Sequence, residues 1–237
     1  KYVNEVSIYW VCNKAKEITK VHKTLEVDVS TTMWIKCGCI TLTHQDRNQL
    51  SGCSELTDKH INAAQELMRL QFPEIDGLRD TLLQNKPFQQ QANCSQILQA
   101  IVIRHCHWAC VQIMKGSVFL YDSAYSSASI DTLCVISRLV HCMESSYGIN
   151  VMNIAKQTGG LDCGLYAIAV LTSLSFDQDP TTIVYDQDSM RSHFIDCLES
   201  GAMVPFPVKK HRRPANRIAN IETCEVHCDC RMPFEGE

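Results

Sequence analysis

The chain passes from a polar loop into a long apolar run at residues 157–176, which read QTGGLDCGLYAIAVLTSLSF. The run after Gly164 has no polar face, which is typical of a helix buried on all sides. We therefore expect a buried helix that begins at Cys163. Unpaired N–H groups and the helix dipole favour a thiolate at this position, so the pattern predicts Cys163 as a nucleophile. Gly159 and Gly160 allow a substrate backbone to approach closely. The alternative is that Cys163 is one more buried structural cysteine.

A nucleophilic cysteine needs a base, and the base needs a group that orients it. Residues 100–114 and 117–123 read as two strands joined by a tight turn at Lys115-Gly116. In such a hairpin the numbers of facing residues add up to about 231, so His107 lies diagonally opposite Asp122. The pattern predicts His107 as the base and Asp122 as the group that orients it.

Two assignments around this pair leave alternatives open. His105 is a rival base, because it lies two residues upstream and shares a face with His107 in one continuous strand. The oxyanion of an acyl transfer needs hydrogen-bond donors, which the Cys163 backbone N–H and the Gln157 side chain can supply. The alternative for Gln157 is an exposed loop glutamine.

Composition limits the class of protein. The chain has 237 residues, 45% of them hydrophobic, which suffices for one domain with a substantial core. The net charge of −4 gives no general reason to expect nucleic acid as a partner of the main domain, and no apolar run reaches the ~20 residues that cross a bilayer. Most of the 14 cysteines lie in apolar stretches, which favours free thiols and an intracellular setting. The chain begins at Lys1 without a signal-peptide pattern, so we expect a soluble intracellular segment of a longer protein.

The organisation along the chain is predicted in four parts. We expect an accessory N-terminal segment at 1–48, a main domain at 49–207, a basic linker at 208–222 and a Cys/His-rich segment at 223–237. The accessory segment holds two β-rich patches, at 6–12 and 32–43. Apolar spacing in the main domain predicts helices at 56–72, 131–143 and 189–200 and a strand at 149–155.

The last segment raises the question of a metal. Its sequence TCEVHCDCRMP contains Cys224, His227, Cys228 and Cys230, and it resembles the opening of a PHD finger whose remaining ligands would lie beyond Glu237. Free thiols or a small zinc site built from these four residues are the alternatives. We assign no metal and no cofactor. The basic run at 209–217 reads as a linker, with a nuclear-import signal or a phosphate-binding patch as alternatives.

The chemistry-bearing residues also resemble a known family. The order of His107-Trp108, the YDS at 121–123 and the QTGGLDCG at 157–164 is similar to that of the Ulp/sentrin-specific proteases. LTDKHI at 56–61 resembles the helix start W-L-N-D-x-x-I of that family. The resemblance covers about residues 50–207, and it extends to the divergent Ulp-like domains of transposon-related reading frames in animals.

The resemblance implies an α+β, papain-like fold of the Ulp type, with a central mixed sheet packed against a buried helix that starts at the nucleophile. It implies His107 as base, Asp122 as orienting group, Gln157 as oxyanion donor and Cys163 as nucleophile. Trp108 would line the channel through which a Gly-Gly tail reaches the cysteine. The sequence departs from the family at Glu55, which stands where the family has a tryptophan before L-N-D.

The function expected from these observations is that of a cysteine peptidase or isopeptidase. Its partners would be ubiquitin-like proteins, SUMO-like in particular, as precursors or conjugates, in the nucleus or cytoplasm. A complete PHD finger would add a contact with chromatin, and no membrane is expected as a partner. Two alternatives stay open: a processing protease for a mobile-element polyprotein, which Glu55 favours, and a catalytically silent module that binds a ubiquitin-like protein.

Overall fold

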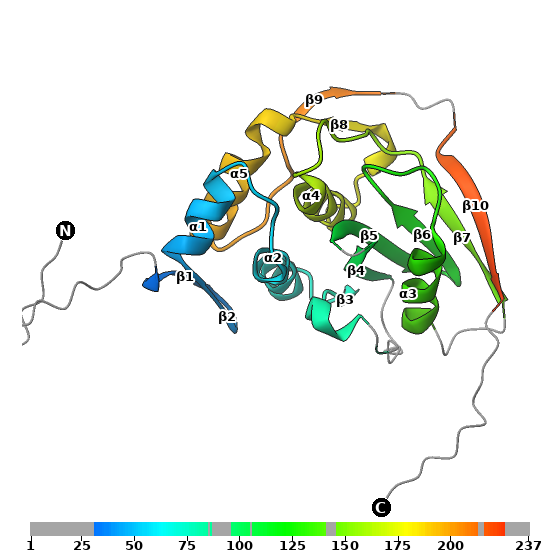
Figure 1. Ribbon diagram of the computed structural model, residues 1–237, viewed down its shortest axis with the longest axis horizontal. Helices are drawn as coiled ribbons and strands as arrows, with labels where there is room; N and C mark the ends of the chain where they lie inside the picture. The colour runs from blue at the N-terminus through cyan, green and yellow to red at the C-terminus, as the bar shows by residue number, and fades with distance from the viewer. Residues whose placement is uncertain are drawn as a thin grey trace, which may run out of the picture.

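The computed structural model describes residues 31–84, 86, 96–104, 106–140, 146–212 and 216–225, with the backbone alone for 146, 147, 224 and 225. Its elements follow one another along the chain as shown in Figure 1. The order is β1 (Met33–Cys37), β2 (Ile40–Thr43), α1 (His44–Ser51), α2 (Asp58–Gln71), β3 (Asp76–Gly77), η2 (Thr81–Leu83), β4 (Ile97–Ile103), β5 (His107–Met114), β6 (Ser117–Tyr121), α3 (Ile130–Val140), β7 (Ser146–Met152), α4 (Cys163–Ser175), η3 (Pro180–Thr182), β8 (Ile183–Tyr185), α5 (Gln187–Ser200), β9 (Val208–His211) and β10 (Ile218–Glu225).

The central sheet is mixed. Its strands lie in the order β10-β7-β6-β5-β4-β3. The β4–β5, β5–β6 and β7–β10 pairs are antiparallel, whereas β3–β4 and β6–β7 are parallel. The expected α+β class with a central mixed sheet is confirmed.

Alternating side chains of the sheet fill two separate cores. Along β5, Trp108 and Cys110 belong to the core that contains α4, whereas Ala109 and Val111 belong to the core that contains α3. This period of two is the geometry of a strand with both faces covered. Figure 1 shows α4 and α2 on one side of the sheet and α3 on the other.

The helix α4 is the centre of the larger core. Every one of its residues is buried, including Cys163 at its start. Neighbouring parts of the same core come from α2 and α5, for example through Met68 and Phe194, which are both 0% exposed. The prediction of a helix buried on all sides that begins at Cys163 is confirmed, because an apolar run without a polar face can be stable only under such cover.

The hairpin of β5 and β6 has the predicted register. Cys110 pairs with Tyr121, and Met114 pairs with Ser117 around the turn at 115–116. This register determines which residues stand at the far ends of the two strands, where His107 and Asp122 lie.

One expected strand is in fact two. Residues 100–114 were predicted as one strand, but β4 ends at Ile103 and β5 begins at His107, and the two pair antiparallel. Arg104 adopts a left-handed backbone with φ of 49°, which reverses the chain direction. The stretch contains no glycine or proline, so composition gave no turn signal there. The rival base His105 lies outside the described residues.

Both flanks of the expected main domain pack onto it. Cys37 and Leu42 of the β1–β2 hairpin lie in the same core as α4. Residues 208–222, expected as a linker, contain β9, which pairs with β8, and the start of β10, which forms the edge of the central sheet beside β7. The division of the chain into four domains stays a prediction.

Some predicted features lie outside the described residues. They are the patch at 6–12, the side chain of Cys224, and His227, Cys228 and Cys230. None of the helices in the described ranges has the length and apolar character needed to span a bilayer.

Candidate active site

Cys163 is the first residue of α4, and its side chain is buried, with 3% of the residue exposed. The N-cap residue Asp162 makes no side-chain hydrogen bond to the helix. The N–H groups of the first turn therefore have no side-chain cap and can act on a negative charge at Cys163. Gly164 allows the close packing of this turn, because a Cβ there would lie 3.0 Å from Leu56 Cβ and 3.3 Å from Ile61 Cδ1.

His107 and Asp122 meet at the ends of their strands. His107 Nε2 and Asp122 Oδ1 are 2.8 Å apart, and the same oxygen accepts the backbone N–H groups of Ala124 at 2.8 Å and Tyr125 at 2.9 Å. Burial by itself would raise the pKa of Asp122, which is 1% exposed. The hydrogen bond and charge of His107, with the two N–H groups, outweigh that burial and lower the pKa below its usual value. Asp122 is therefore a carboxylate that holds the imidazole in place.

His107 also contacts Cys163. Burial would lower the pKa of His107, but hydrogen bonds and charge interactions with Asp122 and Cys163 together raise it to about 9. Because Nε2 faces Asp122, the nitrogen that faces the thiol is Nδ1. The imidazole thus stands between a carboxylate and a thiol, and at neutral pH it holds a proton.

Gln157 is held next to this pair. Its Oε1 accepts a hydrogen bond from Ser123 Oγ at 2.6 Å, and its backbone N–H donates to the Ser123 carbonyl at 3.0 Å. Its Nε2 donates to the Gly159 carbonyl at 2.9 Å, which uses one of two N–H bonds. Gly159 has a φ of 77°, a conformation that favours glycine and folds the loop back toward Gln157. One amide hydrogen of Gln157 is left to donate to another group.

The loop from Gln157 to Cys163 is clamped from α5. The Gln187 side chain binds both backbone groups of Thr158, accepting from its N–H at 2.8 Å and donating to its carbonyl at 2.8 Å. The same amide donates to Asp162 Oδ2 at 2.7 Å. Arg191 donates to Asp162 Oδ1 through Nε at 3.1 Å and Nη2 at 2.6 Å. Both ends of the loop are therefore fixed by the first two turns of one helix.

The other predicted residues lie around the cysteine. Trp108 is 7% exposed, and its Nε1 donates to the Leu56 carbonyl at 3.2 Å. Gly160 is exposed in the loop before Cys163. The structure brings His107, Asp122 and Cys163 into contact, and it places Gln157 beside Asp122 through Ser123.

Sequence reasoning missed Ser123, Gln187 and Arg191. Ser123 follows Asp122 directly, so its proximity to the site was readable once Asp122 was chosen. Gln187 and Arg191 belong to a helix that begins 24 positions after Cys163 in the sequence, and no local motif marks them. Only the packing of α5 against the loop reveals their role.

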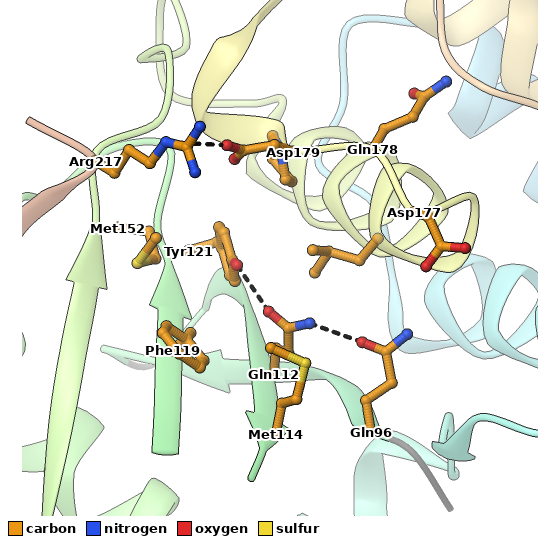
Figure 2. Close-up of a pocket in the computed structure, with 12 residues that line it drawn as sticks. Gln96, Gln112, Met114, Phe119, Tyr121, Met152, Asp177, Gln178, Asp179 and Arg217 are labelled. Carbon is orange, nitrogen blue, oxygen red and sulfur yellow. Dashed lines mark hydrogen bonds and ion pairs between the residues drawn. The ribbon is translucent and has the colours of Figure 1, made fainter.

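A separate cavity lies at the opposite end of α4 from Cys163. It has a volume of about 430 Å³ and is formed beside Leu174 by the sheet and the segment after the helix. Figure 2 shows that its polar groups already bind one another: Tyr121 donates to Gln112 at 2.8 Å, and Gln112 donates to Gln96 at 2.7 Å. In the part of the chain that the structure describes, no three His, Cys, Asp or Glu side chains gather in a way that would hold a metal ion.

Comparison with solved structures identifies the fold. The SUMO protease Ulp1 with an oxidised catalytic cysteine superposes with a TM-score of 0.58 at 16% identity over 72% of this chain and 89% of that one. The Ulp1 protease domain in complex with Smt3, the yeast orthologue of SUMO, gives 0.58 at 16% identity over 72% and 88%. A Ulp1-like SUMO protease catalytic domain from Chaetomium thermophilum gives 0.53 at 17% identity over 74% and 85%. The chain has the fold of the Ulp1-type SUMO proteases.

The Ulp1-type fold confirms the architecture that the sequence resemblance implies. No model of a protein family matches the sequence, and no curated protein matches it either. At 16–17% identity the likeness establishes the Ulp1-type fold alone, so an activity must be argued from the site itself.

Proposed function

We propose that the protein is a cysteine peptidase or isopeptidase that cleaves ubiquitin-like proteins, SUMO-like in particular, from precursors or conjugates. The observation that carries the proposal is the contact of one imidazole, His107, with both a buried carboxylate, Asp122, and a thiol at the start of a helix, Cys163. A nucleophile, a base that contacts it and a group that orients the base are the elements of acyl transfer. The Ulp1-type fold supports a ubiquitin-like substrate.

In the proposed first step, the Cys163 thiolate attacks the scissile carbonyl carbon, while the imidazolium of His107 holds the proton. The oxyanion that forms is bound by the Cys163 backbone N–H and by the free amide hydrogen of Gln157. Collapse of the intermediate breaks the C–N bond, and His107 gives its proton to the leaving amine. The product is a thioester between Cys163 and the substrate.

In the second step, His107 is neutral and takes a proton from a water molecule that attacks the thioester carbonyl. The C–S bond breaks, the carboxylic acid leaves, and the thiolate–imidazolium pair is restored. Asp122 keeps the Nε2 side of the ring in place through both steps, so that Nδ1 faces the sulfur each time.

The proposal is tested with a panel of propargylamide probes built on ubiquitin and several ubiquitin-like proteins, read by intact mass. We expect one covalent adduct per chain with at least one SUMO-like probe, and peptide mapping should place it on Cys163. The chain contains 14 cysteines, so the position of the adduct is informative. An adduct on another cysteine would contradict the mechanism.

The same panel separates two other functions. A mobile-element processing protease would leave the panel unlabelled but would cleave peptides without a preference for Gly-Gly, and Glu55 is the residue that favours this function. A silent module would bind one of the ubiquitin-like proteins without an adduct or turnover. Either result would overturn the proposed activity.

Replacing Gln187 by methionine should lower kcat about tenfold to a hundredfold, with KM changed less than about twofold. Methionine keeps the length of the side chain but removes the hydrogen bonds to Thr158 and Asp162, so the loop that presents Gln157 and Cys163 loses its anchor. Steady-state kinetics and far-UV circular dichroism measure the two effects. Ser192→Ala, an exposed change on the same helix, is the control. A rise in KM at constant kcat would instead assign Gln187 to substrate binding.

A further inference from the structure

A second pocket is formed in part by the chain neighbours of His107. It has a volume of about 370 Å³ and lies between the start of α2, the short helix η2 and the ends of β4 and β5. Cys106 and Trp108, which precede and follow His107 in the chain, both line it. A substrate side chain in this pocket therefore belongs to a residue near the scissile bond.

The charge of this pocket is negative. Glu55 and Asp58 line it, and no Lys, Arg or His is among the described residues around it. Both residues are exposed, and among the described ion pairs neither carboxylate has a partner. Two unpaired carboxylates on one small pocket repel each other. One cation bound between them lowers the electrostatic energy of both.

The inner wall of the pocket carries an unused hydrogen-bonding group. Thr81 lines the pocket and is 3% exposed, yet its hydroxyl has no hydrogen-bond partner in the described part of the chain. Its backbone N–H is bound by Asn62 at 3.0 Å, which fixes the residue in place. Buried hydroxyls are satisfied in most proteins, so an unsatisfied one on a pocket wall has room for a polar partner, which is either ordered water or a polar group of a ligand. The nearby Gln84 is different, because its amide is used by both backbone groups of Val102.

Apolar surface completes the pocket. Leu82 is 75% exposed on η2, and Leu56 and Trp108 form the side toward α2 and β5. A basic side chain has a hydrocarbon stem and a charged head with several hydrogen-bond donors. The stem can cover the apolar surface while the head reaches the acceptors. An acidic side chain would meet two like charges, and an apolar one would leave the Thr81 hydroxyl unpaired.

We propose that this pocket binds an arginine or lysine side chain of the substrate, within four residues of the scissile bond. The stem lies along Leu82 and Trp108, and the charged head binds Glu55, Asp58 and the Thr81 hydroxyl. The inference rests on the proposed peptidase function and adds a substrate preference to it. Glu55, the residue that departs from the family pattern, is then a specificity residue of this protein.

The test uses internally quenched peptides that contain a Gly-Gly sequence with four variable residues on each side. Each variable position carries Arg, Lys, Gln or Glu. We expect kcat/KM to be about tenfold higher for Arg or Lys than for Gln at one position, because the hydrogen bonds involve charged groups, and lowest for Glu. The preference should disappear in the Glu55→Gln, Asp58→Asn double variant and turn toward Glu in Glu55→Lys. Asp131→Asn, an exposed carboxylate on α3, is the matched control and should keep the preference.

Binding to the Cys163→Ala protein separates the inference from the function on which it rests. Fluorescein-labelled peptides with Arg or with neutral citrulline at each position are compared by fluorescence anisotropy at low and high salt. Tighter binding of the Arg peptide without turnover by the wild type would uphold the pocket and overturn the peptidase. Turnover without a basic preference at any position would uphold the peptidase and overturn the pocket. Equal loss of preference in Asp131→Asn would also overturn it, because the effect would then be one of total charge.

Discussion

In the Cys163→Ala protein, kcat is expected to fall by about 10⁶-fold. The proposed thioester needs the sulfur of Cys163, and the described cysteine that lies on the same strand as His107 cannot replace it. That residue, Cys110, is 0% exposed, and burial raises the pKa of its thiol well above the usual value. A thiol that stays protonated is a poor nucleophile. Cleavage of the best quenched peptide and labelling by the best probe are the measurements.

Cys110→Ala is the matched control for that experiment. It also removes a buried sulfur, so any loss of core packing is comparable, and it should keep both labelling and turnover. Equal labelling of Cys163→Ala and wild type, or loss of labelling in Cys110→Ala at unchanged stability, would refute the assignment of the nucleophile.

In Asp122→Asn, kcat/KM at pH 7 is expected to fall by about 10²- to 10³-fold. Asparagine can keep Oδ1 as the acceptor for the N–H groups of Ala124 and Tyr125, so the local backbone has no reason to move. The same Oδ1 also continues to accept from His107 Nε2, so the ring keeps its orientation, but the negative charge that stabilises the imidazolium is lost. The thiolate–imidazolium pair of Cys163 and His107 is then less populated at neutral pH, because the pKa of the imidazole falls.

The pH profile distinguishes this effect from simple misfolding. The active pair needs the imidazolium, whose pKa is about 9 in the wild type, so kcat/KM should decline as the pH rises through about 9. The carboxylate raises that pKa, so in Asp122→Asn the alkaline decline should move to lower pH. Asp131→Asn should leave both the rate and the profile unchanged. An alkaline decline at the same pH in Asp122→Asn would contradict the role given to Asp122.

The architecture was predictable where one sequence pattern served one structural purpose. The run after Cys163 is apolar on all sides, and the structure buries every residue of the helix α4. The hairpin register followed from the turn at 115–116, and Cys110 does pair with Tyr121. The strand boundary at Arg104 was not predictable, because no glycine or proline marks it.

The surroundings of the site were harder to predict than its centre. Cys163, His107 and Asp122 each belong to a local pattern, and the register of one hairpin brings two of them to the same end. Gln187 reaches the loop only because α5 packs beside it, a contact that no short-range pattern encodes. Likewise, β10 was expected as part of a basic linker, yet its backbone pairs with β7 at the sheet edge. The PHD-like tail, the transposon-related origin and the nuclear or cytoplasmic location stay predictions.

An NMR titration of the His107 imidazole tests the central arrangement most directly, because it needs no substrate. With labelled histidine, and His107→Gln to assign the signal among the nine histidines, the ring should titrate with a pKa of about 9 in the wild type. The value should fall in both Cys163→Ala and Asp122→Asn, because the first change removes a hydrogen bond and a charge that raise it and the second removes a charge that raises it. A His107 pKa near the ordinary 6.5, equal in all three proteins, would contradict the account.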